Sequence, residues 1–230
     1  MRLTQPTVTH RHEADRPIPM LVWRFPEPVW AIASGPLGGG VGLRRWVINA
    51  TVDSAYSRHD PDRHLAELAR GLGLDGAGVG MLTAVDVTEA DTADDDGATV
   101  AATVGLGHPT WAAAPDGHLR RGRPAAPGTI NIVAWLPVPL SVGALVNAVA
   151  TATEAKTQAL WECGVEATGT ASDALCILCP TAGDLGAAGS GAAEPYGGPR
   201  SVWGGRLARA VHATVTAGTR RWHESGLTDR

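Results

Sequence analysis

The stretch that decides the fold runs from residue 128 to residue 179 and reads GTINIVAWLPVPLSVGALVNAVATATEAKTQALWECGVEATGTASDALCILC. Residues 129–136 are mostly apolar and β-branched or aromatic, which predicts a strand. Ser141 can cap a helix over residues 142–163, because apolar residues recur there at helical spacing. Residues 174–179 are continuously apolar and predict a second buried strand. The stretch therefore predicts a strand, a long helix and another strand, in that order.

Around this stretch the chain has more strand-like segments than helices. Five segments have the composition of strands: residues 20–25, 29–33, 43–52, 79–87 and 99–106. We expect the last two to pair across an acidic loop, and we expect helices that begin at Asp60-Pro61 and near residue 202. This order favours an α+β fold with mixed or antiparallel sheets and helices on the outer faces. Residues 1–19 are polar and proline-punctuated, so we interpret them as a loosely ordered segment before one domain over residues 20–230.

The composition limits the partners and the compartment. The net charge of −4 argues against a nucleic-acid partner, which requires a basic surface. No stretch reaches the length of an apolar membrane span, and the polar N-terminus lacks the apolar middle region of a signal peptide. We therefore expect a cytoplasmic protein with no nucleic-acid or membrane partner. The sequence leaves open whether the protein forms a homo-oligomer.

Two features that could indicate a metal site have simpler interpretations. Cys176 and Cys179 have C-x-x-C spacing, but they fall in an apolar run and no second Cys or His pair completes a zinc site. The acidic residues between positions 88 and 97 lack the ligand spacing of a calcium loop, so we interpret that segment as a solvated hairpin loop. We therefore expect no metal and no cofactor.

The aromatic residues are unevenly distributed, with eight Trp beside one Phe and two Tyr. We interpret the tryptophans as core and rim packing. The alternative is that some of them form a flat apolar wall for a large ring ligand, the candidates being Trp30, Trp46, Trp111, Trp135 and Trp203.

Thr129 is the first candidate for chemistry. It opens a strand directly after a long loop rich in Gly, Pro and Arg, so its hydroxyl would face the opening of that loop. Hydrolysis of an amide needs an attacking oxygen, a proton carrier and a donor for the developing oxyanion. Thr129 can supply the oxygen. The alternatives for Thr129 are contact with a ligand and a hydrogen bond to the backbone at the start of the strand.

The proton carrier could be Asp173, Lys156 or Glu154. Asp173 precedes a buried strand, where an unpaired charge would be costly, so we expect it to have a partner such as Lys156. Lys156 falls on the apolar stripe of the long helix, and Glu154 falls nearly on the opposite side. Lys156 could instead extend its ammonium to water, and Glu154 could be an ordinary solvated helix residue.

Several further residues could bind the substrate or its oxyanion. Asn131, or the backbone N–H groups of the turn at Gly39 and Gly40, could donate to the oxyanion. A loop around Gly169 is rich in hydroxyls suited to hydrogen-bonding amides, although such residues are also common in turns; these are Thr168, Thr170 and Ser172.

Three blocks of the central stretch, GTINI at 128–132, TATEAKT at 151–157 and ATGTASDA at 167–174, resemble the cobinamide amidohydrolase family, the enzymes that salvage incomplete corrinoids. Blocks at 34–40 (SGPLGGG), 79–84 (VGMLTA) and 104–108 (VGLGH) match in the same order. The resemblance implies an amidohydrolase of cobalamin biosynthesis that cleaves adenosylcobinamide into adenosylcobyric acid and 1-amino-2-propanol. It also adds Ser34 and His108 to the substrate-binding residues, with His108 standing where the family often has asparagine.

A second, shorter resemblance covers residues 128–180. Gly128-Thr129, the strand, turn and helix that follow, and Ser172-Asp173 are similar to N-terminal-nucleophile amidases of the aminopeptidase/ornithine acetyltransferase type. This resemblance implies an αββα sandwich with the site between two sheets, and self-cleavage between Gly128 and Thr129. The enzyme alternative to cobinamide hydrolysis is a self-processing aminopeptidase, and the alternative from another class is a corrinoid-binding protein without catalysis.

Overall fold

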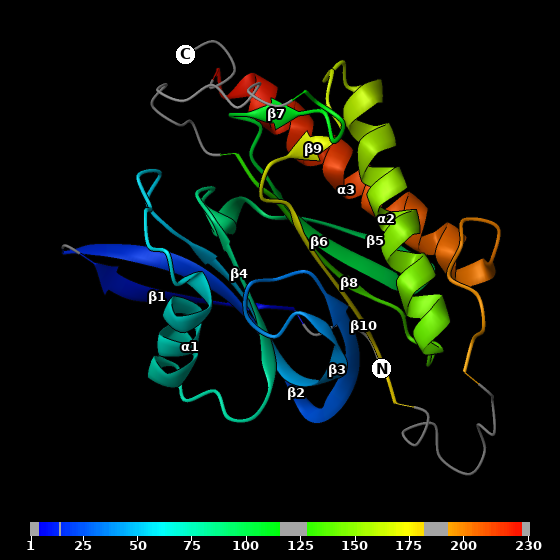
Figure 1. The fold of residues 1–230 in the computed structure, drawn as a ribbon, viewed down its shortest axis with the longest axis horizontal. Coiled ribbons are helices and arrows are strands. Elements are labelled where there is room, and N and C mark those ends of the chain that lie inside the picture. The colour runs from blue at the N-terminus through cyan, green and yellow to red at the C-terminus, as the bar shows by residue number, and fades with distance from the viewer. Residues whose placement is uncertain (1–4, 14, 116–127, 182–192, 227–230) are drawn as a thin grey trace.

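The computed structural model of the 230-residue chain describes residues 5–13, 15–115, 128–181 and 193–226 (Figure 1). The strands are β1 (Thr7–Glu13), β2 (Arg16–Ala33), β3 (Gly40–Thr51), β4 (Gly78–Thr83), β5 (Asp91–Asp95), β6 (Ala98–Val104), β7 (Pro109–Thr110), β8 (Ile130–Trp135), β9 (Gly169–Thr170) and β10 (Ala174–Cys179). The helices are α1 (Pro61–Gly71), α2 (Val142–Glu162) and α3 (Val202–Glu224), with a 3₁₀ turn η1 (Val87–Glu89). Within these described residues the α+β class is confirmed.

One mixed sheet of eight strands forms the centre of the molecule, in the order β4-β3-β2-β10-β8-β6-β5, and β1 adds to β2. The long strand β2 belongs to both halves of this sheet, since it pairs with β3 and β1 and, through residues Trp30–Ala33, with β10. Its register with β3 shifts between Arg24 and Val29, where Pro26 and Pro28 cannot donate ladder hydrogen bonds. The two strands expected at residues 20–25 and 29–33 are therefore one strand, β2, with an irregularity at these prolines.

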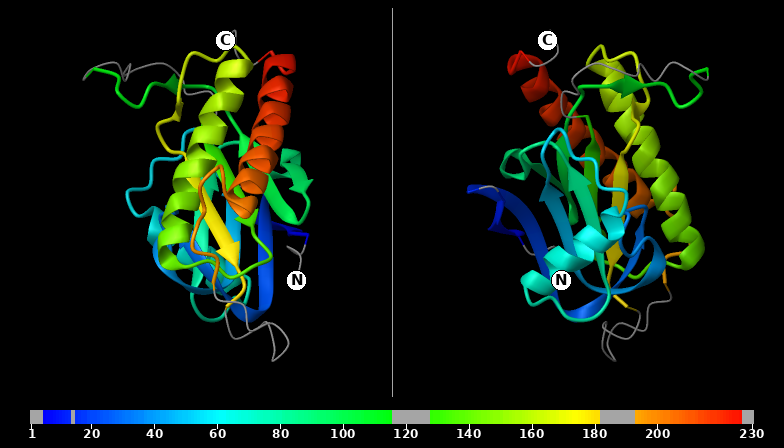
Figure 2. Two further views of the ribbon diagram at one scale, coloured as in Figure 1. Left: turned by 90° about the vertical axis from the view of Figure 1, so that its right-hand side faces the viewer. Right: turned by 60° about the vertical axis from the view of Figure 1, so that its left-hand side comes forward.

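The sheet folds over so that its two halves face each other. Leu21, Trp23 and Val47 from the first half bury their side chains in one cluster with Val133 and Cys176 from the second half. Helix α1 covers the outer face of the first half, and α2 and α3 lie side by side over the outer face of the second (Figures 1 and 2). The result has αββα layers, but the two β layers are continuous through β2 rather than being two separate sheets.

The unit that positions the site is β8-α2-β10. Strands β8 and β10 are parallel neighbours, with Asn131 opposite Ala174, so both begin at the same edge of the sheet. Helix α2 begins at the Ser141 cap, whose hydroxyl accepts the N–H of Ala144, and it packs through small residues that let its backbone approach the strands closely: Ala144, Ala148, Ala152, Ala155 and Ala159. This unit confirms the strand, helix and strand predicted from the sequence.

Two expectations about the N-terminal half are wrong. Residues Thr7–Glu13 are not loosely ordered, because they form β1 and pair with Arg16–Val22 of β2. Strands β4 and β6 do not pair with each other, since β4 pairs in parallel with β3 while β6 lies between β5 and β8. The connection between β4 and β6 is a crossing from one half of the folded sheet to the other, which local patterns do not reveal.

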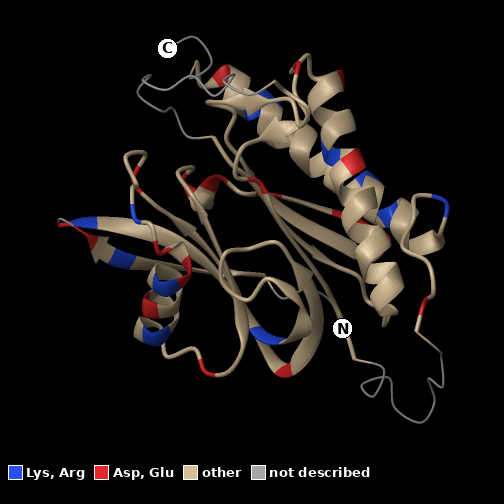
Figure 3. Cartoon of the chain, in the orientation of Figure 1, with Lys and Arg blue, Asp and Glu red and all other residues tan. Residues whose placement is uncertain are grey.

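The acidic segment after η1 is a strand and not a solvated loop. It forms β5, and three arginines of α3 compensate its charges: Arg221 pairs with Asp91, Arg209 pairs with Asp95, and Arg206 pairs with Asp96. Figure 3 shows basic residues along α3. Each pair is partly exposed and contributes little to stability individually, but together they fix the edge strand against the helix.

Helix α1 begins at the expected Asp60-Pro61 boundary, but Asp60 does not cap it with its side chain. Pro61 starts the helix as expected, but the carboxylate of Asp60 makes no capping hydrogen bond. It accepts instead from the Arg58 guanidinium, at 2.9 Å to each oxygen, and this interaction lowers the pKa of Asp60 to about 2.

The tryptophans do not form one wall. Trp135 lies between the sheet halves, Trp46 lies under α1, Trp203 packs at the edge of the helix layer, and Trp111 is 44% exposed. Core and rim packing describes most of these residues.

His64 of α1 gives a pH-dependent contribution to stability. Its ring is buried, stacks on Tyr56 and lies with Nδ1 3.0 Å from the Tyr56 hydroxyl. Burial, with further lowering by Arg58 and Arg11, depresses the pKa of His64 below its ordinary value of about 6.5. The unfolded chain then binds the proton more readily, so we expect stability to be retained above pH 6.5 and to fall as the pH drops below it.

Urea unfolding at pH 8, 6 and 5 tests this expectation on the protein and on His64→Gln, whose amide can still bond Tyr56. As the pH falls, the unfolding free energy of the unsubstituted protein should decrease more than that of the variant. Parallel curves would show that His64 does not contribute to the acid sensitivity.

Candidate active site

The site forms where β8 and β10 begin. The hydroxyl oxygens of Thr129 and Ser172 lie 2.6 Å apart, although 43 positions separate the two residues in the chain. Both hydroxyls also lie near the carbonyl oxygen of Gly128, at 2.9 Å for Thr129 and 3.3 Å for Ser172. Either hydroxyl can donate to this carbonyl while the other donates to its neighbour. Thr129 is buried and Ser172 is exposed, so the pair runs from the protein interior to its surface.

The hydroxyl pair opens into a cavity of about 390 Å³ between the two halves of the sheet. One side comes from the second half and from His108, and the other from the end of β4 and the segment after β3. The lining consists of Pro36, Val52, Asp53, Ser54, Tyr56, Pro61, Leu82, Thr83, Ala84, His108, Gly128, Thr129, Ser172 and Ala174. The volume suits one arm of a large substrate rather than the whole of it.

His108 is held next to the hydroxyl pair by the backbone. A Cβ atom added to Gly128 would lie 3.1 Å from the backbone nitrogen of His108, so the two segments are in close contact. The imidazole itself is exposed and lines the same cavity. An imidazole in this position can serve as a general base and then as a general acid.

Asp173 is the centre of a second set of contacts directly behind the hydroxyl pair. Its Oδ1 accepts from the backbone N–H of Ile130 at 2.9 Å and from the hydroxyl of Thr170 at 2.6 Å. Its Oδ2 accepts from the backbone N–H of Thr170 at 3.1 Å and from the Lys156 ammonium. Four donors occupy the carboxylate, so it fixes the start of β8, the β9 segment and Lys156 relative to one another.

Gly169 lets this ion pair form. A Cβ atom on Gly169 would lie 2.2 Å from Oδ2 of Asp173 and 2.4 Å from Nζ of Lys156. The side chains of Lys156 and Asp173 are only 11% and 15% exposed. Residue 169 therefore has to be glycine for the pair to keep this geometry.

The Lys156–Asp173 pair lines a second cavity of about 300 Å³ on the α2 side of β8 and β10. The rest of the lining is small or apolar, apart from Ser34 and Thr153: Ile130, Ile132, Val149, Ala152, Ala174 and Leu175. Ser34 is tied to β10, since its hydroxyl accepts the N–H of Leu175 at 3.0 Å. Ala174 borders both cavities, so the hydroxyl pair and the ion pair lie on opposite sides of the same strand.

The family model of adenosylcobinamide amidohydrolases matches residues 5–226, which is nearly the whole chain. The chain belongs to the adenosylcobinamide amidohydrolase family. A curated adenosylcobinamide amidohydrolase from Methanosarcina mazei is 32% identical over 189 residues, which cover 82% of this chain and 88% of that protein. Another from Halobacterium salinarum is 40% identical over 121 residues, which cover 51% of each chain.

A solved structure, the L-aminopeptidase D-Ala-esterase/amidase from Ochrobactrum anthropi, covers 93% of this chain and 82% of its own chain at 13% identity and a TM-score of 0.36. This likeness is too weak to transfer a mechanism to the adenosylcobinamide amidohydrolase. The assignment to the family therefore rests on sequence, and the α+β class rests on the helices and strands described above.

Four of the residues suggested for this adenosylcobinamide amidohydrolase site lie elsewhere. Glu154 is exposed on the outer face of α2, away from Asp173. Asn131 points into the layer between the sheet halves, where its amide donates to Asn49 at 2.8 Å and to the carbonyl of Leu82 at 2.9 Å. Gly39 precedes β3 and Gly40 is its first residue, and neither of them lines either cavity.

Thr168 and Thr170 support the site from the β7–β9 segment. Thr168 accepts the N–H of Ala112 at 2.8 Å and fixes β9 against β7, while Thr170 binds Asp173 directly. The residues that sequence analysis missed come from the other half of the sheet, chiefly Asp53 and Tyr56 after β3. Their signal in the sequence is a polar loop after a buried strand, which is too common to identify a site.

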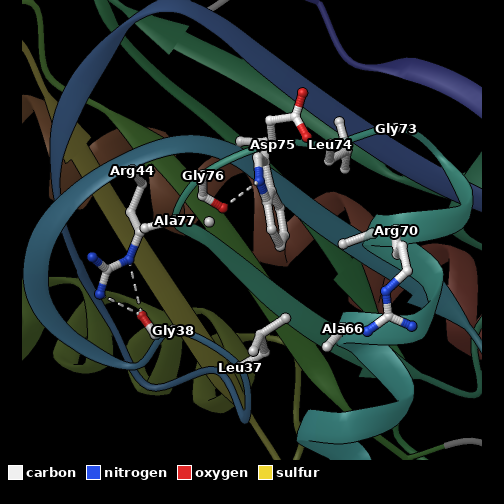
Figure 4. Close-up of a pocket in the computed structure, with 13 residues that line it drawn as sticks. Leu37, Gly38, Arg44, Ala66, Arg70, Gly73, Leu74, Asp75, Gly76 and Ala77 are labelled. Atoms are coloured by element: carbon white, nitrogen blue, oxygen red, sulfur yellow. Dashed lines mark hydrogen bonds between the residues drawn. The ribbon is translucent and has the colours of Figure 1, made fainter.

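A further cavity, of about 510 Å³, lies at the other end of β4 (Figure 4). Gly78 starts β4 and lines this cavity, whereas Thr83 ends β4 and lines the hydroxyl cavity. In Figure 4, Arg44 and Gly38 frame one side and Arg70 frames the other. A strand of this length separates the two cavities by roughly 17 Å, so the larger one is not part of the hydroxyl site.

Three further properties concern other kinds of site. Burial raises the pKa of Cys176 to about 12 and that of Cys179 to about 11, so neither thiol is an activated nucleophile. In the described part of the chain, no three His, Cys, Asp or Glu side chains come together as metal ligands. No helix in that part is both long enough and apolar enough to cross a membrane.

Proposed function

We propose that this amidohydrolase cleaves the amide between the corrin propionyl arm and aminopropanol of adenosylcobinamide at the Thr129–Ser172 hydroxyl pair. The supporting observation is that two hydroxyls 2.6 Å apart line a cavity with His108, in a chain that matches the family over residues 5–226. The products are adenosylcobyric acid and 1-amino-2-propanol, as the family assignment implies. The large corrinoid would remain largely outside the cavity, with only its amide arm inserted.

The attacking atom in this proposal is the Thr129 hydroxyl oxygen. It forms a bond to the amide carbon while its proton passes through Ser172 to the His108 imidazole. The protonated imidazole returns that proton to the amide nitrogen, the carbon–nitrogen bond breaks and aminopropanol leaves. Water then attacks the resulting ester, releases the corrinoid acid and restores the Thr129 hydroxyl.

Asp173 does not accept the proton in this scheme. Its oxygens already accept four hydrogen bonds, and the Lys156 ammonium has Asp173 as its partner on the opposite side of β10 from the hydroxyl pair. Asp173 is therefore a positioning residue that holds Ile130, and with it Thr129, at the cavity. In the lining, the side chains of His108 and Asp53 are the candidates for the general base.

Aminopropanol release from adenosylcobinamide is the direct test. We expect release without added nucleotide and without loss of activity in a chelator, because the proposed chemistry uses only side-chain hydroxyls and an imidazole. Chromatography of both products after incubation with and without chelator measures it. Absence of adenosylcobyric acid would favour the alternative of a corrinoid-binding protein without catalysis, and loss of activity in the chelator would require a metal in place of the hydroxyl mechanism.

A further inference from the structure

A pair of exposed tryptophans lies on segments that adjoin the proposed site but takes no part in the proposed mechanism. The rings of Trp111 and Trp161 have centroids 6.3 Å apart and are tilted by 56°. Trp111 is 44% exposed and Trp161 is 63% exposed, whereas the other described aromatic pairs lie in the core or against α1. Two indoles that leave this much ring surface in water present a ready stacking surface for an aromatic ligand.

The position of Trp111 is fixed by the small β7–β9 sheet. Thr110 pairs with Gly169 and Pro109 pairs with Thr170, so Trp111 directly follows this short ladder. Thr168 accepts the Ala112 N–H at 2.8 Å and its own N–H donates to the carbonyl of Thr110 at 3.1 Å. Trp111 is therefore held by its neighbours on both sides rather than lying on a free loop.

The position of Trp161 is fixed by α2. Trp161 follows Thr157 by one helical turn, and the Thr157 hydroxyl donates to the carbonyl of Thr168 at 3.2 Å. Figure 1 shows β7 and β9 beside the C-terminal end of α2. The two indoles thus meet because α2 and the β7–β9 sheet are hydrogen-bonded to each other.

The same segments carry the residues of the site. Trp161 lies five residues after Lys156, which corresponds to about 7.5 Å along the helix axis. His108 precedes β7, and Thr170 of β9 binds Asp173. The tryptophan pair therefore belongs to the same segments that hold His108, Lys156 and Thr170.

We infer that Trp111 and Trp161 bind the adenine of the substrate's adenosyl group by stacking, while the amide arm occupies the hydroxyl cavity. This inference rests on the proposed function. The purine is the planar aromatic part of adenosylcobinamide, whereas the corrin ring carries substituents on its periphery and faces that oppose flat stacking. A base can stack on an indole over a range of angles, so an exposed pair of tilted indoles can bind it.

The test compares two ligands that differ at the adenosyl position. Trp111→Leu and Trp161→Leu keep apolar bulk but remove the indole, and equilibrium dialysis gives the Kd of each protein for adenosylcobinamide and for cyanide-liganded cobinamide. We expect the Kd for adenosylcobinamide to rise about tenfold in each variant, which is the loss expected for one base–indole stack, while the Kd for the cyanide form stays unchanged. The matched control is Tyr196→Leu, an aromatic residue that is 71% exposed near the opposite end of α2, where no change is expected.

Each other result overturns the inference. If the Kd values for both ligands rose equally, the indoles would contact the corrin ring and not the adenine. If neither Kd changed, the indoles would not contact the substrate. Unchanged Kd values with an altered sedimentation coefficient would assign the pair to a contact between two copies of the chain. The proposed function is judged separately, by the release of aminopropanol from the unsubstituted protein and by the hydroxyl variants.

Discussion

Thr129→Ala is expected to lower turnover of adenosylcobinamide by at least about 1,000-fold while leaving its Kd within about threefold. The substitution removes the attacking oxygen but only a small part of the cavity lining, since Thr129 is almost fully buried. Product chromatography measures turnover, and equilibrium dialysis measures binding.

The matched control for Thr129 is Ser172→Ala, which keeps the nucleophile but removes its neighbour at 2.6 Å. Because Ser172 only passes the proton from Thr129 to His108 in the proposed mechanism, we expect this variant to keep more activity than Thr129→Ala. If Ser172→Ala were the inactive variant and Thr129→Ala remained active, the two hydroxyls would exchange roles. Activity in both variants would exclude the hydroxyl pair from the chemistry.

Intact-mass measurement of the same preparations decides the self-processing alternative. A freed α-amine on Thr129, with a pKa near neutrality, could act as its own base only after cleavage of the Gly128–Thr129 bond. We expect a single uncleaved chain that turns over, because His108 is already available in the cavity. Fragments corresponding to residues 1–128 and 129–230 in every active preparation would favour the free-amine mechanism instead.

Asp173→Asn is expected to fold but to lose at least about 100-fold in turnover, because the carboxylate holds Ile130, Thr170 and Lys156 together. The variant leaves the Lys156 ammonium, whose side chain is 11% exposed, without its counter-charge. Breaking a buried pair in this way costs about 3 kcal/mol of unfolding free energy. Circular dichroism melting and turnover measure the two effects separately.

The double variant Asp173→Asn/Lys156→Met separates charge from position. Removing both charges should recover much of the lost stability, because no unpaired ammonium remains, but it should not recover turnover. Near-wild-type turnover in either variant would remove Asp173 from the positioning of the site. Recovery of both stability and turnover in the double variant would show that only the unpaired charge was harmful.

The local pattern of the sequence was enough to predict the elements that carry most of the site. Strands β8 and β10 are continuous apolar runs, and α2 has a capping serine and an apolar stripe, so their identity did not depend on distant residues. The predictions for β4 and β5 were wrong because the local sequence does not determine the partner of β4 or the strand character of β5. Both depend on groups remote in sequence, namely β3 for β4 and the arginines of α3 for β5.

The same distinction applies to the candidate residues. Thr129, Ser172, Asp173 and Lys156 come together because β8 and β10 are adjacent and parallel, which places their first residues side by side. Asn131 lies two positions after Thr129, within β8, but its amide nitrogen already donates two hydrogen bonds between the sheet halves. Asp53 and Tyr56 could not be predicted, since they reach the cavity only when the sheet folds over.

The pairing of β2 with β10 has a consequence for synthesis of the protein. Strands β1, β2 and β3 are neighbours in sequence and can pair soon after they emerge from the ribosome, but Trp30–Ala33 must wait for Cys176–Cys179. Until then the apolar edge of β2 is open to pairing with other chains, and the Thr129–Ser172 site cannot exist. Nascent chains that stop before β10 should therefore be the aggregation-prone form of this protein.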